Sequence, residues 1–337
     1  MDQVKVAVIG AGLIGSLYAR ICRQLVGVEL VAICDVMAER AEALAKELGA
    51  LAYAGNGYRQ FIQGQPGVDG IIVSCPEDSH VAPALAALEG GKHVLIEKPL
   101  ATTSRDAKQI VQAATTQTVT TMVAYSLRFD PRYAAMKQAI AGGEIGDITH
   151  IYARRTPPAA ALERIKGRVE LPFWVGVHDI DMMRWITRSE VKRVFASSTN
   201  KGTEGWNVRS AIFANLTFED GVIAVLENAW GPSPASNRQL STAFFRVQGT
   251  QGFIEIVSHE QGIRIVHGGE SVSPDTVYMP NVHGRITGAY RDQIAYFARC
   301  IREGKQSEIT LQDGLKGVMV AEAIIRSAEQ QQPIDLG

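Results

Sequence analysis

The chain has 337 residues, of which 46% are hydrophobic and 20% charged, with a formal net charge of -1. At roughly 100 to 200 residues per domain, this length favours two globular domains. The balanced charge lacks the basic surplus of nucleic-acid-binding proteins, so we expect no nucleic-acid partner. No apolar stretch approaches the roughly 20 residues of a membrane span, so we expect no membrane partner either. The four cysteines form no CxxC pair, which is typical of reduced thiols in a cytoplasmic protein.

The first third of the chain alternates short apolar runs with segments of helical periodicity. The apolar runs, typical of buried strands, lie at 4–9, 28–35, 68–75, 92–97 and 119–125. The helical segments lie at 13–25, 37–49, 80–91 and from about residue 104. Strands that alternate with helices imply right-handed crossovers. This part is therefore predicted to be an α/β Rossmann domain with a mostly parallel, doubly wound sheet, over residues 1–124.

The pattern changes after residue 125, where we place the boundary of a second domain, 125–337. Helical segments are predicted at 131–141, 178–187, 287–303 and 311–328. Strands are predicted at 192–199, 208–218, 221–230, 240–249, 252–257 and 262–266. Several of these strands alternate apolar with polar residues, which predicts an α+β domain with a large, mostly antiparallel open sheet. Too few helices remain to cover both sheet faces, so we expect a homodimer or homotetramer formed through this sheet. Residues 156–171 are predicted to be a long loop.

A glycine-rich turn follows the first strand and fits the GxGxxG pattern of dinucleotide-binding proteins. The residues of this turn that we assign to cofactor binding are Gly10, Gly12, Leu13, Ile14 and Gly15. Gly12 would let the backbone approach a pyrophosphate at the helix N-terminus, and Gly15 would let the helix pack close to the sheet. Asp35, at the end of the second strand, stands where a carboxylate binds the ribose hydroxyls. A carboxylate repels a 2′-phosphate, so NAD is favoured over NADP, although Arg40 follows a turn later. The alternative is an ordinary glycine turn with Asp35 as a helix cap.

Two further strand ends carry polar residues at the edge where ligands bind in an open parallel sheet. One strand leads into Cys75-Pro76 and His80, and the other into Glu97-Lys98-Pro99. We therefore add these residues to the cofactor site: Cys75, Pro76, His80, Glu97 and Lys98. Pro99 restricts the backbone of Lys98 and so directs its side chain. The alternative for Lys98 is a solvated lysine before a helix.

Several segments together resemble the Gfo/Idh/MocA oxidoreductases, the family of glucose-fructose oxidoreductase and inositol dehydrogenase. They are VAVIGAGLIG, SCPEDSH, ALEGGKHVLIEKPL, YSLRFDPRY and GEIGDITHIYARR. The most specific of these motifs is Glu97-Lys98-Pro99, and the resemblance extends over essentially the whole chain. It implies a Rossmann domain followed by a domain built on a large open sheet. It also implies that Lys98 contacts cofactor and substrate, and that the Lys98-Pro99 bond is cis.

The segment 173–185, FWVGVHDIDMMRW, is predicted to supply the other half of the site. His178 and Asp181 are three residues apart and share a face of a helix. His178 is a candidate general base for a substrate hydroxyl, with Asp181 binding or orienting the substrate. For an isolated histidine, an ordinary buried side chain beside a capping aspartate would be preferred. The resemblance favours the functional interpretation, because family members carry a histidine here that works with the lysine.

The sequence departs from the family pattern at position 174. Many sugar and inositol dehydrogenases of the family place an aspartate four residues before the histidine, where this chain has Trp174. Either Asp181, Asp179 or Glu170 replaces the missing carboxylate, or Trp174 supplies an apolar or stacking wall to the substrate.

Further candidates surround the predicted domain junction. Arg154 and Arg155 end the strand that opens the second domain, and they either bind an anionic group or form a solvated edge. Tyr125 and Arg128 follow the last Rossmann strand and either line the substrate site or have a structural role. The full set that we assign to substrate binding is Lys98, Tyr125, Arg128, Arg155, Trp174, His178 and Asp181. We assign catalysis to Lys98, His178 and Asp181, and we assign no metal ligand.

These observations predict reversible hydride transfer between NAD and a secondary hydroxyl of a sugar, cyclitol or related polyol. Two alternatives remain open. One is a glycosidase that keeps NAD tightly bound and cleaves its substrate through transient oxidation. The other is a sensor of the same fold that binds NAD without turnover, which Trp174 in place of aspartate keeps open.

Overall fold

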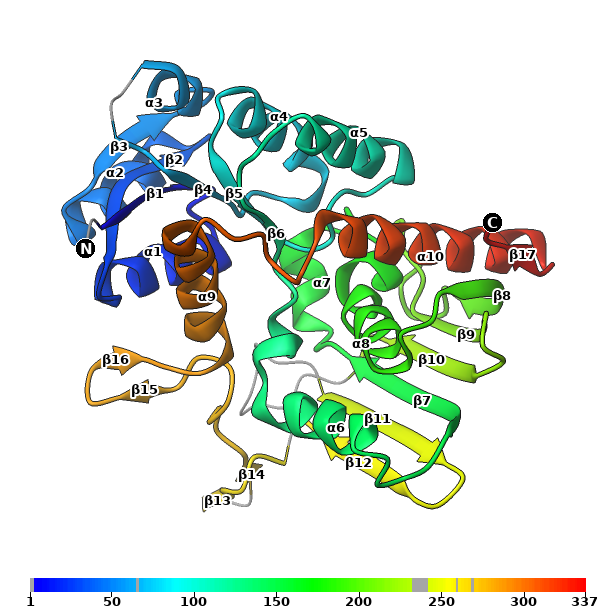
Figure 1. The fold of residues 1–337 in the computed structure, drawn as a ribbon. Coiled ribbons are helices and arrows are strands. Elements are labelled where there is room, and N and C mark those ends of the chain that lie inside the picture. Colours follow the sequence, from blue (N-terminus) through cyan, green and yellow to red (C-terminus); the bar gives the residue numbers. More distant parts are fainter. Residues whose placement is uncertain (1–2, 65–66, 232–241, 259, 268–269) are drawn as a thin grey trace. The chain divides into compact units, whose positions relative to one another are not determined.

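The computed structural model describes residues 3–64, 67–231, 242–258, 260–267 and 270–337 (Figure 1). The chain divides into two compact units. The first unit comprises Met1–Phe129 and Tyr278–Lys316, and the second comprises Asp130–Val277 and Gly317–Gly337. The sequence boundary at residue 125 placed all later residues in the second domain. In the structure, helix α9 (Ala289–Glu303) instead packs beside α1 (Leu13–Gln24) in the first unit, because Gln293 reaches the buried Tyr18 hydroxyl.

The first unit contains a six-stranded parallel sheet in the order β3-β2-β1-β4-β5-β6. Its strands are β1 (Val4–Ile9), β2 (Val28–Asp35), β3 (Leu51–Ala54), β4 (Gly70–Val73), β5 (His93–Ile96) and β6 (Thr121–Val123). Its helices, besides α1 and α9, are α2 (Ala38–Leu48), α3 (Tyr58–Gly64), α4 (Val81–Glu89) and α5 (Ser104–Thr115). This arrangement confirms the predicted Rossmann sheet. β3 and α3 were not predicted from the sequence, because β3 is an edge strand whose residues are mostly exposed and lack the apolar signal.

Helices pack in two groups in this unit. One group holds α1, α2 and α9, and the other holds α3, α4 and α5 (Figure 1). The central strands are consequently buried on both faces, as in β4, where every residue is buried. A strand covered on both sides needs apolar residues at every position, which explains why these strands are continuous apolar runs.

The strand order reverses between β1 and β4, which lie next to each other although the first crossover goes to β2. Their carboxyl ends are joined directly: the Ser74 backbone N–H donates to the Ile9 carbonyl at 2.8 Å. The Ser74 hydroxyl also lies 3.1 Å from the Gly10 carbonyl oxygen. The loops after β1 and β4 therefore flank the reversal point, where ligands bind in open α/β sheets.

The second unit is built on a seven-stranded sheet in the order β12-β11-β7-β10-β9-β8-β17. Its strands are β7 (Ile148–Thr156), β8 (Val191–Thr199), β9 (Ala211–Phe218), β10 (Ile223–Ala229), β11 (Thr242–Gly249), β12 (Phe253–Val257) and β17 (Ile334–Asp335). Only the β7–β10 pair is parallel, which confirms a mostly antiparallel sheet. The predicted strand 240–249 begins at Leu240 and Ser241, which lie outside the described residues.

Helices and small hairpins complete the structure. The second unit contains α6 (Pro131–Ala141), α7 (Ala160–Ile165), a π-helical turn (Pro172–Gly176) and α8 (Val177–Thr187). The predicted strand at 262–266 is instead part of a separate hairpin of β13 (Ile265–His267) and β14 (Glu270–Val272). Short 3-10 turns lie at Glu77–Ser79 and Ser126–Phe129, a second hairpin pairs β15 (Asn281–Val282) with β16 (Arg285–Ile286), and α10 spans Leu311–Gln330.

The predicted long loop at 156–171 is corrected by α7. Ala161, Leu162 and Ile165 are all buried there. These positions share one face of α7, so the helix buries their apolar surface together. The surrounding prolines and charged residues concealed this signal in the sequence.

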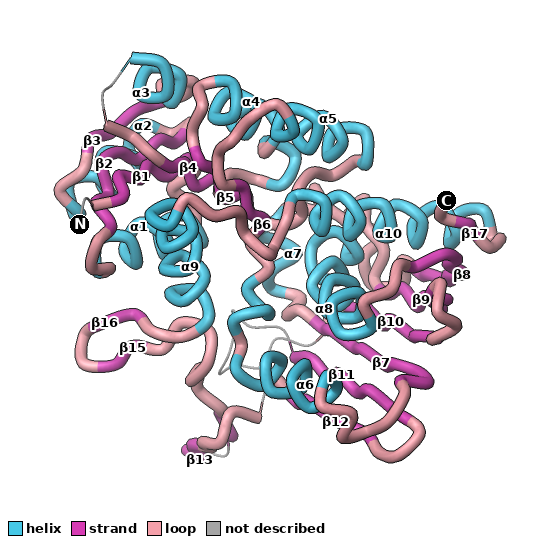
Figure 2. The backbone as a smooth tube through the Cα atoms, viewed as in Figure 1, coloured by secondary structure: helices cyan, strands magenta, loops and turns pink. Residues whose placement is uncertain are grey.

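One face of the second sheet carries helices, and on the other, called the open face below, the described part of the chain leaves large apolar side chains exposed. Helices α6 and α8 pack against the covered face (Figure 2). Large apolar side chains on the open face are between 39% and 56% exposed, namely Phe195, Phe213, Ile223 and Phe253. The strict alternation of buried and exposed residues along β9 and β10 separates the two faces, as predicted.

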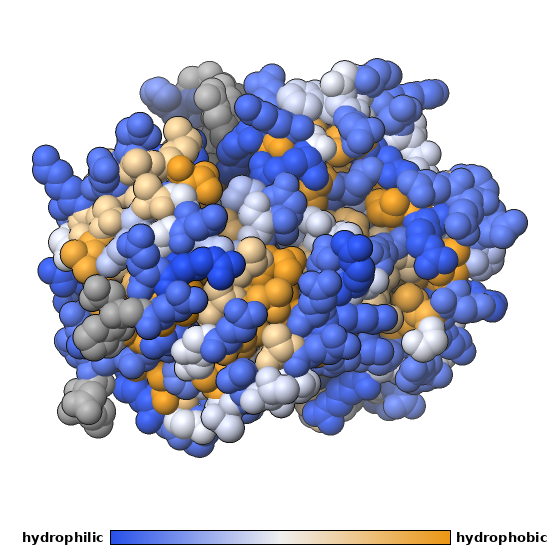
Figure 3. All heavy atoms as spheres, turned by 90° about the horizontal axis from the view of Figure 1, so that it is seen from above, coloured by the Kyte–Doolittle hydropathy of each residue, from blue (hydrophilic) through white to orange (hydrophobic). Residues whose placement is uncertain are grey.

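Hydrophilic side chains dominate the surface drawn in Figure 3 and are interrupted by apolar patches. Among the residues that the structure describes, no helix combines the length and the apolar character needed to cross a membrane.

Candidate functional site

The glycine turn after β1 has the geometry of a dinucleotide-binding loop. Gly10 has a φ of 101°, and a side chain there would lie 2.6 Å from the backbone of Ser74. A Cβ on Gly15 would lie 1.7 Å from the Gly10 carbonyl oxygen, so the helix can pack only with glycine at this position. Gly12 differs, because no described atom lies within 4 Å of the position that its Cβ would occupy. The outer two glycines close the turn, and the middle one leaves open space in front of it.

This open space lies at the N-terminus of α1, which has Gly12 as its N-cap and no side-chain cap among the described residues. Unpaired backbone N–H groups and the helix dipole favour an anion at such a position. Leu13 is 50% exposed in the first turn, and Ile14 beside it is partly buried. The predicted pyrophosphate-binding residues therefore lie together at the start of α1, around the open space in front of Gly12.

Asp35 connects the end of β2 to the glycine turn. It is 8% exposed; one carboxylate oxygen accepts the Ala11 N–H at 2.7 Å, and the other accepts the Met37 N–H at 2.9 Å. Each carboxylate oxygen can accept two hydrogen bonds, so both retain capacity for ribose hydroxyls. Asp35 thus has a structural contact as well as the position expected of the ribose-binding carboxylate.

The loop after β4 is fixed by His80. This histidine is 1% exposed, and its two ring nitrogens lie 2.9 Å from the Pro99 carbonyl and 3.0 Å from the Cys75 carbonyl. Burial lowers the pKa of His80. Because both ring nitrogens face backbone carbonyls, His80 connects the loops after β4 and β5 and acts on a bound cofactor only through them.

The other two residues assigned to this loop differ in exposure. Pro76 is exposed, whereas Cys75 is partly buried and donates its thiol to the Ser79 carbonyl at 3.2 Å. Burial raises the pKa of Cys75 to about 12, so the thiol is not a nucleophile near neutral pH. Any contact of Cys75 with a cofactor is therefore one of packing.

The end of β5 carries the motif that raised the family resemblance. The Lys98-Pro99 peptide bond is cis, which confirms that prediction. Glu97 is 8% exposed and Lys98 is partly buried. The Lys98 N–H donates to the Glu97 carboxylate at 3.0 Å, so the acidic side chain turns back onto the backbone of the lysine.

Tyr125 and Arg128 lie in the interior of the first unit. Tyr125 has no exposed surface. The Arg128 side chain is 8% exposed; its guanidinium donates to the Glu308 carbonyl at 3.3 Å and lies 3.5 Å from the Asp313 carboxylate. Arg128 therefore connects the end of the Rossmann sheet to residues far along the chain, which supports the structural alternative for this residue.

In the second unit, strand alternation separates Arg154 from Arg155. Arg155 lies on the helix-covered face and donates to both oxygens of Asp179, at 2.8 and 2.7 Å. The exposed fractions of the two side chains are 7% and 0%, so this is a buried bidentate ion pair. Arg154 points to the open face, where it pairs across the sheet with Glu227 and Phe244.

The structure also places the carboxylates considered as substitutes for the missing aspartate. Asp179 is engaged by Arg155, and Glu170 accepts from the Arg209 guanidinium and, at 3.1 Å, from the Arg209 N–H. Asp181 is fully buried. Two of the three candidates are thus committed to ion pairs, and the third lies beneath the protein surface.

Trp174 and His178 flank the start of α8. Trp174, in the π-helical turn, stacks on Trp230 with ring centroids 5.1 Å apart and an interplanar angle of 29°. Both tryptophans and His178 are partly buried. Trp230 was not among the residues predicted from the sequence, because an aromatic residue at the end of a strand is more often part of a core. Lys98 belongs to the first unit, whereas Trp174 and His178 belong to the second.

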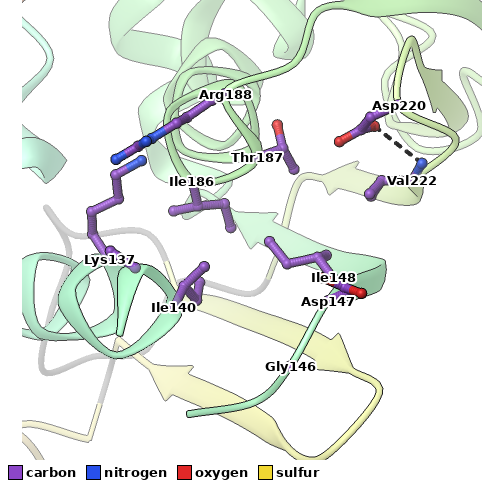
Figure 4. A pocket seen from close by; sticks show the side chains of 11 residues that line it. Lys137, Ile140, Gly146, Asp147, Ile148, Ile186, Thr187, Arg188, Asp220 and Val222 are labelled. Atoms are coloured by element: carbon purple, nitrogen blue, oxygen red, sulfur yellow. Dashed lines mark hydrogen bonds between the residues drawn. The ribbon is translucent and has the colours of Figure 1, made fainter. Parts of the chain in front are cut away.

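A cavity of about 570 Å³ lies in the second unit, away from these residues (Figure 4). Lys137 and Arg188 point toward each other at one end of it. Its lining includes Ile148, at the start of β7, whereas Arg155 is near the end of that strand. The two positions are roughly 23 Å apart at about 3.3 Å per residue. This cavity is therefore separate from the predicted substrate residues.

Comparison with known proteins gives consistent matches over both parts of the chain. Residues 4–125 match a family model described as an oxidoreductase family with an NAD-binding Rossmann fold. Residues 133–255 match the GFO/IDH/MocA C-terminal domain.

Individual relatives match over nearly their full length. An inositol 2-dehydrogenase from Saccharopolyspora erythraea is 30% identical, covering 99% of this chain and 96% of the relative. The scyllo-inositol 2-dehydrogenase (NAD(+)) of Bacillus subtilis is 28% identical with the same coverage. The solved structure of myo-inositol 2-dehydrogenase from Lactobacillus plantarum covers 100% of both chains with a TM-score of 0.88 at 23% identity, which shows a shared fold.

Proposed function

The chain belongs to the Gfo/Idh/MocA family of NAD-binding oxidoreductases, and on that premise we propose that its substrate is an inositol or a related cyclitol. The reaction would be reversible hydride transfer between NAD and a secondary hydroxyl of that substrate. The observation that carries this proposal is Lys98, a partly buried residue just past the carboxyl end of β5, which β4 separates from the strand that leads into the glycine turn. The names of the relatives support the substrate class.

The described residues fit NAD. The turn from Gly10 to Gly15 would hold the pyrophosphate at the N-terminus of α1, and Asp35 would accept hydrogen bonds from the ribose hydroxyls. A carboxylate at this position disfavours the 2′-phosphate of NADP. The cofactor supplies the chemistry of accepting or returning a hydride, which no amino-acid side chain can do.

Lys98 and His178 are the residues to which we assign contact with the reacting hydroxyl. The Lys98 ammonium would donate a hydrogen bond to the substrate oxygen and stabilise the negative charge that develops there. His178 would accept the hydroxyl proton, since an imidazole titrates near neutral pH. Asp181 follows one turn later on α8 and is fully buried, so we assign it the role of orienting this helix face.

The tryptophan stack supports a ring-shaped substrate. Trp174, which stacks on Trp230, stands where the family resemblance implies an aspartate. The C–H face of a cyclitol or sugar ring packs on such a surface, whereas its hydroxyls need polar partners elsewhere. We therefore propose that Trp174 binds the substrate by stacking and that this chain holds its substrate differently from relatives with aspartate there.

We also propose that the open face of the second sheet joins copies of this chain into a homo-oligomer. Phe213 and Ile223, on neighbouring strands, are 48% and 56% exposed. Charged residues lie between them and on the adjacent strands, for example Glu227 and Arg154. A flat sheet face with this mixture of apolar and polar groups is typical of a subunit interface.

The test of the proposed function is the substitution Lys98→Ala, assayed with a panel of inositols, sugars and sugar acids and both NAD and NADP. Turnover should fall by roughly 1000-fold or more, because the developing charge loses its partner, while NAD affinity survives. Lys92→Ala is the matched control, since Lys92 is also partly buried and precedes the other end of β5.

Three outcomes contradict parts of this proposal. Turnover of Lys98→Ala within about tenfold of the parent protein, equivalent to about 1.4 kcal/mol of barrier, would remove Lys98 from the chemistry. Release of a leaving group without NADH formation would instead identify a redox-assisted glycosidase. NAD binding with no turnover of any panel member would identify a sensor.

A further inference from the structure

The segment Glu97-Lys98 is attached to the interior of the first unit through the Glu97 side chain. Glu97 is 8% exposed, and both of its carboxylate oxygens accept hydrogen bonds. One accepts the Lys98 N–H at 3.0 Å. The other accepts the hydroxyl of Tyr18, which comes from α1. The carboxylate therefore links the backbone of Lys98 to a helix that begins at the dinucleotide loop.

Tyr18 is itself held by a second helix. Its side chain has no exposed surface, and its hydroxyl oxygen accepts from the Gln293 amide at 2.8 Å. Gln293 is also fully buried and comes from α9, which packs beside α1 (Figure 1). Tyr290, one turn earlier on α9, packs edge to face on the Tyr18 ring with centroids 6.1 Å apart. One oxygen of Glu97 is thus held directly by Tyr18 of α1 and, through the Tyr18 hydroxyl, by Gln293 of α9.

The other flank of Lys98 is attached separately. His80 lies 2.9 Å from the Pro99 carbonyl, so the residues before and after Lys98 each have a buried polar partner. Because the backbone on both sides of Lys98 is held, the remaining motion of this segment is mainly rotation of the lysine side chain. Such support is what holds a reacting group within the narrow geometry that catalysis needs.

We propose that Tyr18 and Gln293 are positioning residues of the reaction, which hold the Lys98 amine in place through the Glu97 carboxylate. The inference rests on the proposed function only in giving Lys98 contact with the substrate. Neither residue belongs to a motif singled out in the sequence, and of the residues assigned to the cofactor site from the sequence, Tyr18 contacts Glu97. Their role follows from the hydrogen-bonded chain Gln293, Tyr18, Glu97, Lys98.

The ionisation of Glu97 makes the effect of this hydrogen-bonded series depend on pH, which packing alone would not do. Burial raises the pKa of Glu97, whereas the charge of Lys98 and the Tyr18 hydrogen bond lower it. The other titratable group that faces this carboxylate is Glu77, from the turn before α4, which raises its pKa. Removing the Tyr18 hydroxyl takes away one of the lowering interactions, so the pKa of Glu97 should rise further.

The experiment is Tyr18→Phe in the full-length protein, with kcat, KM and NAD affinity measured across pH. We expect kcat to fall roughly 10- to 100-fold, because a buried carboxylate oxygen loses its donor, while NAD affinity changes little. Glu97 positions Lys98 as a carboxylate, and that form is lost as the pH falls through its pKa. The acid limb of the kcat profile should therefore move to higher pH in Tyr18→Phe.

Two further variants make the test specific. Tyr58→Phe removes a hydroxyl from another buried tyrosine of the first unit, on α3, and should leave kcat and its pH profile unchanged. Gln293→Met keeps the length of the side chain but removes the donor to Tyr18. It should also lower kcat, but by a smaller factor than Tyr18→Phe does. It also provides a second readout if Tyr18→Phe does not fold.

The outcomes separate this inference from the proposed function. If Lys98→Ala is inactive while Tyr18→Phe and Gln293→Met retain kcat within about twofold and the same acid limb, the positioning role is wrong and the function stands. If Lys98→Ala retains its turnover, Lys98 does not act on the substrate, and the positioning role falls with it.

Discussion

Asp35 and Asp179 are both buried carboxylates, yet their surroundings give them different capacities. Asp179 faces the two donating groups of Arg155, so both of its oxygens are committed to one bidentate ion pair. Asp35 faces two single backbone N–H groups, from Ala11 and Met37. The first arrangement neutralises the carboxylate inside the protein, whereas the second leaves negative charge that a cofactor hydroxyl can use.

The substitution Asp35→Asn tests this difference. It keeps the shape and one acceptor but removes the charge, so NAD affinity should fall by roughly 10- to 100-fold, the effect of losing a hydrogen bond to a charged group. NADP should lose less or gain, since the repulsion of its 2′-phosphate disappears. Titration of each protein with NAD and with NADP measures the ratio of the two affinities.

The control for this experiment is Asp69→Asn. Asp69 also accepts a backbone N–H, from Lys5 at 2.8 Å, but it precedes β4 and so lies at the amino ends of the strands, opposite to the predicted cofactor site. An unchanged NAD to NADP ratio in Asp35→Asn would contradict the assigned role.

At the scale of single elements, the π-helical turn before α8 decides which side chains of this segment are accessible. Trp174 within the turn remains partly exposed and meets Trp230, while Asp181 on α8 is fully buried. The three-residue spacing of His178 and Asp181 predicted a shared helix face. The structure adds that this face runs from a partly buried position at His178 into the interior, so spacing alone overstated the access of Asp181 to substrate.

The substitution Trp174→Ala should raise KM for the cyclitol by about tenfold or more with a smaller change in kcat. A stacking wall binds the substrate and the transition state about equally, and the loss of such uniform binding appears in KM. Steady-state kinetics with the best substrate of the panel provide the measurement.

Trp185→Ala, on the same helix but at its far end beside Lys137, is the control. A fall in kcat equal to the fall in kcat/KM would show that Trp174 acts in the chemical step and not in stacking.

At the scale of the whole molecule, the open face of the second sheet exposes large apolar side chains among the residues that the structure describes. Phe195, Phe213, Ile223 and Phe253 lie on this face, and they come from strands spread across the sheet. Apolar groups distributed in this way lower the free energy of the protein when another surface covers them. The isologous pairing of two such faces is the simplest closed arrangement.

The double substitution Phe213→Glu and Ile223→Glu should therefore reduce the molar mass in solution to that of the single chain, as measured by light scattering. The introduced glutamates of the two subunits would face each other across the proposed interface, and their repulsion would disfavour association. Leu51→Glu, at a 54% exposed apolar position on β3 of the first unit, should leave the mass unchanged. A parent protein that is already a monomer would contradict the proposed assembly.

The sequence by itself determined the elements that local patterns encode. The family resemblance implied the cis Lys98-Pro99 bond, whereas apolar runs, glycines and strand ends were sufficient for the Rossmann sheet, the glycine turn and the place of Asp35 at the end of β2. They were also sufficient for the alternating strands of the second sheet. These features depend on residues close together in the chain, where propensity and periodicity act directly.

Only the tertiary structure decided what each polar side chain meets. Tyr18 and Gln293 are 275 residues apart, and Tyr18 and Glu97 are 79 apart, so no local pattern connects them. The same holds for the packing of α9 in the first unit and for the stack of Trp174 on Trp230. The physical reason is that a buried polar group must find a partner wherever the fold brings one. That partner is set by packing between distant segments.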